Sequence, residues 1–89
     1  MKIGEMFIRD LRPYENNART HSKTQIRPIA KSIKRFGFNS PIGIDDDNRI
    51  VCGHARVEAA KLLGMGSVST CRLSHMSDAE KRGYIIAAR

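Results

Sequence analysis

Residues 50–64, with the sequence IVCGHARVEAAKLLG, constrain the fold of this chain more than any other segment. Three apolar residues open the segment, as is typical of the end of a buried strand, and Gly53 then permits a sharp turn. Good helix formers follow from Arg56 to Leu63, and Gly64 closes the run. The segment therefore predicts a strand, a glycine turn and a helix in direct succession.

The start of this predicted helix is a candidate anion site. A helix that begins directly after a strand directs its unpaired N–H groups and the positive end of its dipole into the space beyond the sheet edge. His54 and Arg56 lie at this position, and Gly53 lets a ligand approach the backbone closely. Arg56 carries a planar cation that can bind two phosphate oxygens at once. A plain turn followed by a solvated arginine is the other interpretation of the same spacing.

The remaining pattern predicts one α+β domain over residues 1–89, with a small mixed sheet of four or five strands and three helices. Because proline cannot donate to a ladder, Arg12-Pro13 should end the first strand. Pro28 requires either a loose first turn in its helix or a helix that begins nearer Arg27. Strands are expected at residues 6–11, 40–45, 49–52 and 68–73, and helices at residues 22–36, 56–63 and 77–88.

The charge balance points to a polyanionic partner. The chain carries a net charge of +7, which favours nucleic acid, although a basic surface can also serve solubility alone. No apolar run is long enough to span a bilayer, and the N-terminus lacks the apolar stretch of a signal peptide. We therefore expect a cytoplasmic protein, encoded by a prokaryote or a phage, that has no membrane partner.

One face of the helix predicted over residues 22–36 is cationic. This face is a candidate for contacts with the DNA backbone, and a merely solvated face is the other interpretation. Its members are Arg27, Lys31, Lys34 and Arg35.

Neither the acidic run nor the cysteines predict a metal site or a disulfide. Asp45, Asp46 and Asp47 are successive side chains that cannot converge on one ion without help, so we expect a hydrated turn and no metal. Cys52 and Cys71 lie in predicted strands rather than in a Cys-x-x-Cys pair, and we expect both to be small buried hydrophobes.

Two runs, IKRFGFNSPIGID from Ile33 and RIVCGHARVEAAKLLG from Arg49, resemble the N-terminal domain of the ParB family, within the ParB/sulfiredoxin superfamily. The resemblance covers residues 7–86 and looks closest to the branch found in phages and beside DNA methyltransferases. It implies a nucleotide site for CTP or ATP with Mg²⁺, in which an Asn-x-Arg element and residues 53–56 lie near the phosphates and residues 37–41 lie near the base. The implied site residues are Asn17, Arg19, Gly37, Phe38, Ser40, Pro41, Gly53, His54, Ala55 and Arg56.

Some of these residues have a second interpretation. Arg19 can be a solvated loop residue, and Phe38 can belong to the core. His54 can act as a general base near neutral pH, with Glu58 as an acidic partner one turn further along, or it can serve as a helix cap.

The sequence also departs from the motifs of its superfamily. Partition proteins carry Gly-Glu-Arg-Arg, whereas here His54 and Ala55 replace the Glu and the first Arg, so we expect phosphate binding more than hydrolysis. Sulfiredoxin carries Gly-Cys-His-Arg, and His54 stands at the position of its reactive cysteine, while Cys52 comes one residue too early. A sulfiredoxin activity is therefore not expected.

Two functions follow from the sequence. The first is a nucleic-acid-associated module that binds a nucleotide phosphate or the DNA backbone at residues 53–56 and serves chromosome or plasmid partition or DNA modification. It would form the N-terminal part of a longer protein, with further domains or a second copy as additional partners. The second is a ParB-like nuclease or nucleotidase that uses His54 and Arg56.

Overall fold

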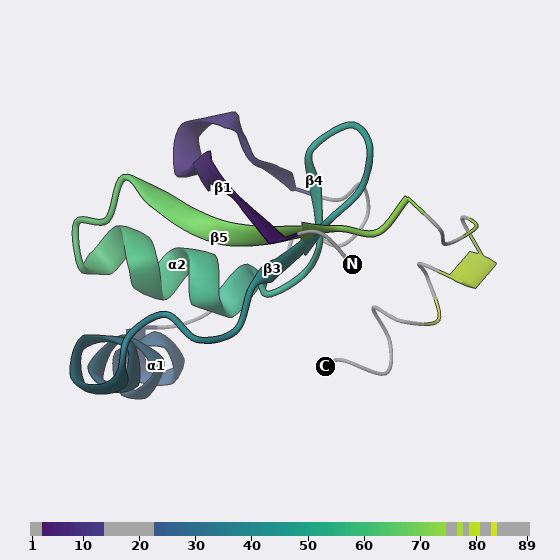
Figure 1. Ribbon diagram of the computed structural model, residues 1–89. Helices are drawn as coiled ribbons and strands as arrows, with labels where there is room; N and C mark the ends of the chain where they lie inside the picture. The colour runs from purple at the N-terminus through teal and green to yellow at the C-terminus, as the bar shows by residue number, and fades with distance from the viewer. Residues whose placement is uncertain (1–2, 14–22, 75–76, 78, 81–82, 84–89) are drawn as a thin grey trace.

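The computed structural model describes residues 3–13, 23–74, 77, 79, 80 and 83. These residues form one mixed sheet that is covered on one face by helices, which confirms the predicted α+β class (Figure 1). Helix α2 lies along the sheet, and α1 packs against α2 on the side away from the strands. Neither of these helices is long and apolar enough to cross a membrane.

Five strands form the sheet, in the order β1-β5-β3-β4-β2. The pairs β1–β5 and β3–β4 are antiparallel, whereas β3–β5 and β2–β4 are parallel. The hairpin predicted around the acidic run is confirmed by the β3–β4 pair. The strands are β1 (Ile3–Phe7), β2 (Arg12–Pro13), β3 (Ile42–Ile44), β4 (Arg49–Cys52) and β5 (Ser67–Arg72).

The described residues contain two α helices, α1 (Lys23–Phe36) and α2 (His54–Leu62), and a short 3₁₀ turn, η1 (Ile8–Asp10). Three helices were predicted. Most of the third falls outside the described residues, but Ala79, Glu80 and Gly83, which belong to it, are helical. Its predicted capping box is present: Ser77 N–H donates to Glu80 Oε1 at 2.9 Å, and Glu80 N–H donates to Ser77 Oγ at 3.1 Å.

The structure corrects two predicted boundaries that involve proline. Pro13 does not end a strand but lies in β2, at the edge of the sheet, where a missing N–H leaves no neighbouring strand unpaired. Helix α1 begins at Lys23 and continues through Pro28, so a start near Arg27 is wrong. Ile26 and Ala30 are buried on either side of this proline, and their packing holds the helix together despite the lost hydrogen bond.

The core lies between the sheet and α2. Its buried members come from β3, β4, β5 and α2. Phe38, in the segment after α1, packs against them. They are Ile42, Ile44, Ile50, Val57, Ala60 and Val68. A second cluster joins the helices, where Ile26 and Ala30 of α1 meet Ala59 of α2. This packing fixes the start of α2 relative to both α1 and β3.

The turn between β3 and β4 is built around Asp45, whose exposure is only 1%. Asp45 Oδ1 accepts hydrogen bonds from the backbone N–H groups of Asp47 and Arg49, both at 2.9 Å. Asp45 Oδ2 accepts one from Arg49 Nε at 2.6 Å. The prediction of a hydrated turn is therefore wrong for Asp45, because a carboxylate that serves three donors can be buried.

The pKa of Asp45 reflects this arrangement. Burial alone raises the pKa, but the hydrogen bonds from the Arg49 backbone, the Arg49 side chain and the Asp47 backbone outweigh burial and hold the pKa below its ordinary value. A carboxyl whose pKa falls on folding stabilises the folded state above the unfolded pKa, and that contribution is lost as the pH falls through the folded value.

We expect Asp45→Asn to lower the free energy of unfolding at pH 7 by about 1 to 3 kcal/mol, because an amide cannot accept all three bonds and presents its own donors to Arg49. The difference from the wild type should shrink as the pH falls below about 4, the pKa of an unfolded aspartate, toward the lower pKa of the folded carboxyl. Urea denaturation at pH 7 and at pH 3 measures both quantities.

Asp46→Asn is the matched control, since Asp46 is exposed and, among the described residues, accepts a hydrogen bond from the Ser74 hydroxyl alone, at 2.6 Å. Equal losses for the two variants at pH 7 would contradict a structural role specific to Asp45.

Candidate anion site at the start of helix α2

Gly53 joins β4 to α2 with a backbone that other residues adopt only under strain. Its φ is 101° and its ψ is 18°, in the left-handed region. An added Cβ would lie 2.7 Å from Ile42 Cδ1 and 3.0 Å from Arg56 Nη2. Glycine is therefore required twice, once for the turn and once for the approach of Arg56. The sequence had predicted that this helix begins at Arg56. It begins at His54 instead, directly after the glycine turn.

The first turn of α2 directs its backbone donors away from the helix. The first helical hydrogen bond runs from Val57 N–H to the Gly53 carbonyl oxygen at 3.0 Å, so the N–H groups before Val57 have no acceptor within the helix. Gly53 supplies no side-chain cap, and the first turn contains no acidic residue. The positive end of the helix dipole is thus not neutralised by a carboxylate of its own turn.

The guanidinium of Arg56 is held at this helix end. Its Nη2 donates to the Pro41 carbonyl oxygen at 3.0 Å and lies against Gly53. Its Nε is buried and has no hydrogen-bond acceptor among the described residues. A buried donor of a permanent cation without an acceptor favours the binding of an anion at this point.

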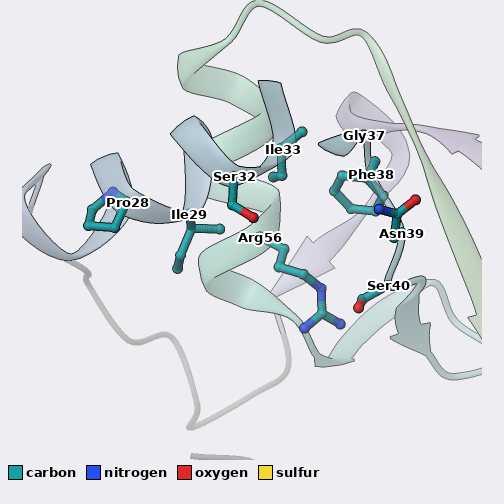
Figure 2. A pocket seen from close by; sticks show the side chains of 9 residues that line it. All are labelled: Pro28, Ile29, Ser32, Ile33, Gly37, Phe38, Asn39, Ser40 and Arg56. Carbon is teal, nitrogen blue, oxygen red and sulfur yellow. The ribbon is translucent and has the colours of Figure 1, made fainter. Parts of the chain in front are cut away.

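A cavity of about 330 Å³ opens beside Arg56, between α1 and the segment that follows it. Figure 2 shows the Arg56 guanidinium reaching from α2 toward Ser40, with Ile29 and Pro28 on the α1 side of the space. Its wall is largely apolar, with the polar groups of Ser32, Asn39 and Ser40. The lining consists of Pro28, Ile29, Ser32 and Ile33 of α1, residues 37–40, and Arg56.

The structure brings together most of the predicted site residues. Gly37, Phe38, Ser40 and Arg56 line the same cavity. Phe38 also packs on the core, as its second interpretation holds, and its contact with a nucleotide stays a prediction. Pro41 and Gly53 adjoin the cavity through their contacts with Arg56. The Ala55 side chain packs against α1, which leaves its backbone N–H as its contribution to the helix start. Asn17 and Arg19 lie outside the described residues.

The contribution of α1 to the cavity was not predicted. Pro28 with Ser32, and Ile29 with Ile33, repeat at a spacing of four residues along one side of this helix, and Asn39 follows its glycine cap. That spacing, shortly before Gly37, is the sequence signal that could have predicted the contribution of α1 to the cavity wall.

His54 is half-buried in the first turn of α2, and its Nε2 atom is buried. Its predicted acidic partner, Glu58, is exposed and forms an ion pair with Lys61 at 3.3 Å. Within the parts of the chain that the structure describes, no group of three His, Cys, Asp or Glu residues is placed to hold a metal ion.

The predicted cationic face of α1 is exposed to solvent. It lies opposite the side on which Ile26 and Ala30 are buried against α2. Its members Arg27, Lys31, Lys34 and Arg35 are all exposed, and DNA contact by them stays a prediction.

A family model described as the ParB N-terminal domain matches residues 1–88. The chain belongs to the ParB N-terminal domain family. A relative from Escherichia coli (strain K12), the ParB-like nuclease domain-containing protein YnaK, is 43% identical over 82 residues, which are 92% of this chain and 94% of that protein. The resemblance that the glycine turn and its flanking runs had indicated is confirmed.

Solved structures show the same fold for this ParB N-terminal domain. The C-terminally truncated chromosome-partitioning protein ParB of Caulobacter crescentus, complexed with CTP-γ-S, superposes with a TM-score of 0.81 at 22% identity, covering 97% of this chain and 51% of that one. A Pnob8-like ParB-N domain gives 0.72 at 16% identity, covering 94% and 34%. Sulfiredoxin of Arabidopsis thaliana gives 0.74 at 19% identity, covering 97% and 98%. The chain thus spans about half or less of the two ParB chains.

We expect Gly53→Ala to destabilise the domain more than a positive φ alone requires, since the new methyl group would meet Ile42 and the Arg56 guanidinium. The left-handed backbone alone costs about 1 to 2 kcal/mol. Urea denaturation measures the total, which should exceed that figure.

Substitutions at two other glycines separate the cost of backbone strain from the cost of the close contact with Arg56. Gly64 has a φ of 75° with no atom within 4 Å of an added Cβ, so Gly64→Ala measures backbone strain alone. Gly66→Ala has neither penalty and should be neutral. If Gly53→Ala costs no more than Gly64→Ala, the close packing of Arg56 on Gly53 is contradicted.

Proposed function

We propose that this ParB N-terminal domain binds the phosphate group of a nucleotide, or a phosphate of the DNA backbone, at the start of α2. It would do so as a nucleic-acid-associated module in the partition or modification of DNA. The observation that carries the proposal is the Arg56 guanidinium, which packs on Gly53 at an uncapped helix N-terminus with its buried Nε lacking an acceptor among the described residues.

Two kinds of donor converge at this point. Backbone N–H groups at a helix start and a planar guanidinium are the two elements that proteins most often combine to hold a phosphate. Gly53 has no side chain, so an anion can approach both without steric hindrance. A mobile water shell is the alternative occupant, and the measurement below separates the two.

The cavity favours a whole nucleotide over a bare phosphate. Its volume of about 330 Å³ lies within the usual range for small-molecule sites, and a largely apolar wall with a few polar groups suits a base and a sugar. Its end at Arg56 suits the phosphates. The ParB structure from Caulobacter crescentus contains CTP-γ-S, which supports CTP as the first candidate, with ATP as the second and Mg²⁺ as the counter-ion of either.

DNA is the proposed partner of the domain. The net charge of +7 and the exposed cations of α1 supply a phosphate-attracting surface that does not require base contacts. Association with a DNA methyltransferase, further domains and self-association belong to the same proposal and rest on the family resemblance.

Hydrolysis is the second candidate function. The related protein YnaK carries a ParB-like nuclease domain in its name, and His54 lies in the same helix turn as Arg56. The ion pair of Glu58 with Lys61 gives no support to Glu58 as the partner of His54. Binding without rapid turnover therefore remains the better-supported function.

We expect Arg56→Ala to weaken the binding of CTP or ATP by about ten- to a hundredfold, the usual worth of hydrogen bonds from a charged group. Arg56→Lys should recover only part of the affinity, because a lysine cannot bind two oxygens with a planar fork. Isothermal titration calorimetry with each nucleotide, with and without Mg²⁺, measures these changes.

Lys61→Ala is the matched control. It removes one cation from the same helix, but Lys61 is exposed and pairs with Glu58. Equal affinity losses for Arg56→Ala and Lys61→Ala would show that only net charge matters and would contradict the proposed site. Absence of nucleotide binding by the wild type would contradict the nucleotide form of the proposal, and only a phosphate of the DNA backbone would then remain as the ligand.

A further inference from the structure

An exposed aromatic ring lies at the end of the cationic helix. Phe36 is the last residue of α1 and is 65% exposed, and the guanidinium carbon of Arg35 lies 5.2 Å from the centre of its ring. The helix is held to α2 by other residues, chiefly Ile26 and Ala30, so the packing of the two helices does not require this ring. An exposed ring with a cation over it offers a stacking surface to a nucleobase.

Among the described residues, no ion pair neutralises the cations around this ring. The sequence of α1 contains five cationic residues and no acidic one. The ion pairs among the described residues join Arg49 to Asp45 and Asp47, and Lys61 to Glu58. None of them involves Arg27, Lys31, Lys34 or Arg35. An unpaired cationic helix face of this kind attracts a phosphate backbone.

A second exposed phenylalanine shows by contrast what is special about Phe36. Phe7 of β1 is 54% exposed and has Arg9 at 4.7 Å from its ring centre. Its neighbours along the chain include Glu5 and Asp10, so its surroundings carry both signs of charge. Only Phe36, of these two rings, adjoins a run of cations without carboxylates.

We propose that the end of α1 is a binding site for single-stranded nucleic acid, in which an unpaired base stacks on Phe36 and phosphates lie along Lys31, Lys34 and Arg35. The bases of a duplex are stacked on each other and cannot offer a face to this ring, whereas an unpaired base can. The site is separate from the helix start at Arg56. It extends the proposed association with nucleic acid by specifying the single-stranded form.

The test is fluorescence anisotropy with a labelled oligothymidylate and a labelled duplex of equal length, using the whole chain at low and at moderate salt. We expect tighter binding to the single strand, and we expect Phe36→Ala to weaken that binding by about tenfold, in line with the loss of one stacked base. Duplex binding should change less than twofold. Phe36→Trp should restore the affinity for the single strand, because it restores the aromatic face.

Phe7→Ala is the matched control, since it removes an exposed, arginine-covered ring from mixed-charge surroundings and should leave both affinities unchanged. Equal effects of Phe7→Ala and Phe36→Ala, or equal binding of both nucleic acids by the wild type, would overturn the inference. Absence of binding to either oligonucleotide would overturn it too. Nucleotide binding at Arg56 is measured separately and can succeed or fail independently of this result.

Discussion

The contact between Arg56 and the bare backbone of Gly53 is the interaction on which the proposed function depends. A long cationic side chain lies against a residue without a side chain, at a φ of 101°, directly after a central strand. The contact holds the guanidinium at the start of α2, where the helix dipole and the N–H groups of the first turn both favour an anion. Any other residue at position 53 would strain the turn and displace the cation.

The rest of the fold holds this contact in place. The Ile42 side chain of β3 lies against Gly53. Hydrogen bonds from Arg49 to Asp45 close the hairpin that pairs β3 with β4. Arg72 Nη1 donates to the Asp45 carbonyl oxygen at 2.6 Å and so ties the hairpin turn to β5. Helix α1 packs on α2 and supplies the far wall of the cavity. One small core thus positions both the cation and the space beside it.

Local signals in the sequence predicted most of the elements, and long-range contacts explain the errors. The glycine between an apolar run and a helix-forming run predicted the β4–α2 junction, and the acidic run predicted the hairpin. Pro13 was misjudged because its place at a sheet edge depends on pairing with a strand more than thirty residues away. Asp45 was misjudged because its burial depends on donors that only the folded turn assembles.

The candidate site was predictable only in part, for a related reason. Gly37, Phe38, Ser40 and Arg56 were expected in one site from the family resemblance. They line the same cavity, and their contact with a nucleotide stays a prediction. The wall formed by α1 was not predicted. Ile29 and Ser32 line the cavity with Arg56 because α1 packs on α2, and the sequence of neither helix alone indicates that packing. The periodicity of a helix predicts which of its faces is buried, but not which element packs against that face.

The most direct measurement is a titration of the ¹⁵N-labelled domain with CTP, followed through the backbone amide resonances. If a phosphate binds at the start of α2, the amides of His54, Ala55 and Arg56 will shift together as the ligand saturates, because new acceptors reach their N–H groups. Shifts spread over exposed lysines and arginines, with the amides of this first turn unchanged, would contradict a phosphate site at Gly53 and Arg56.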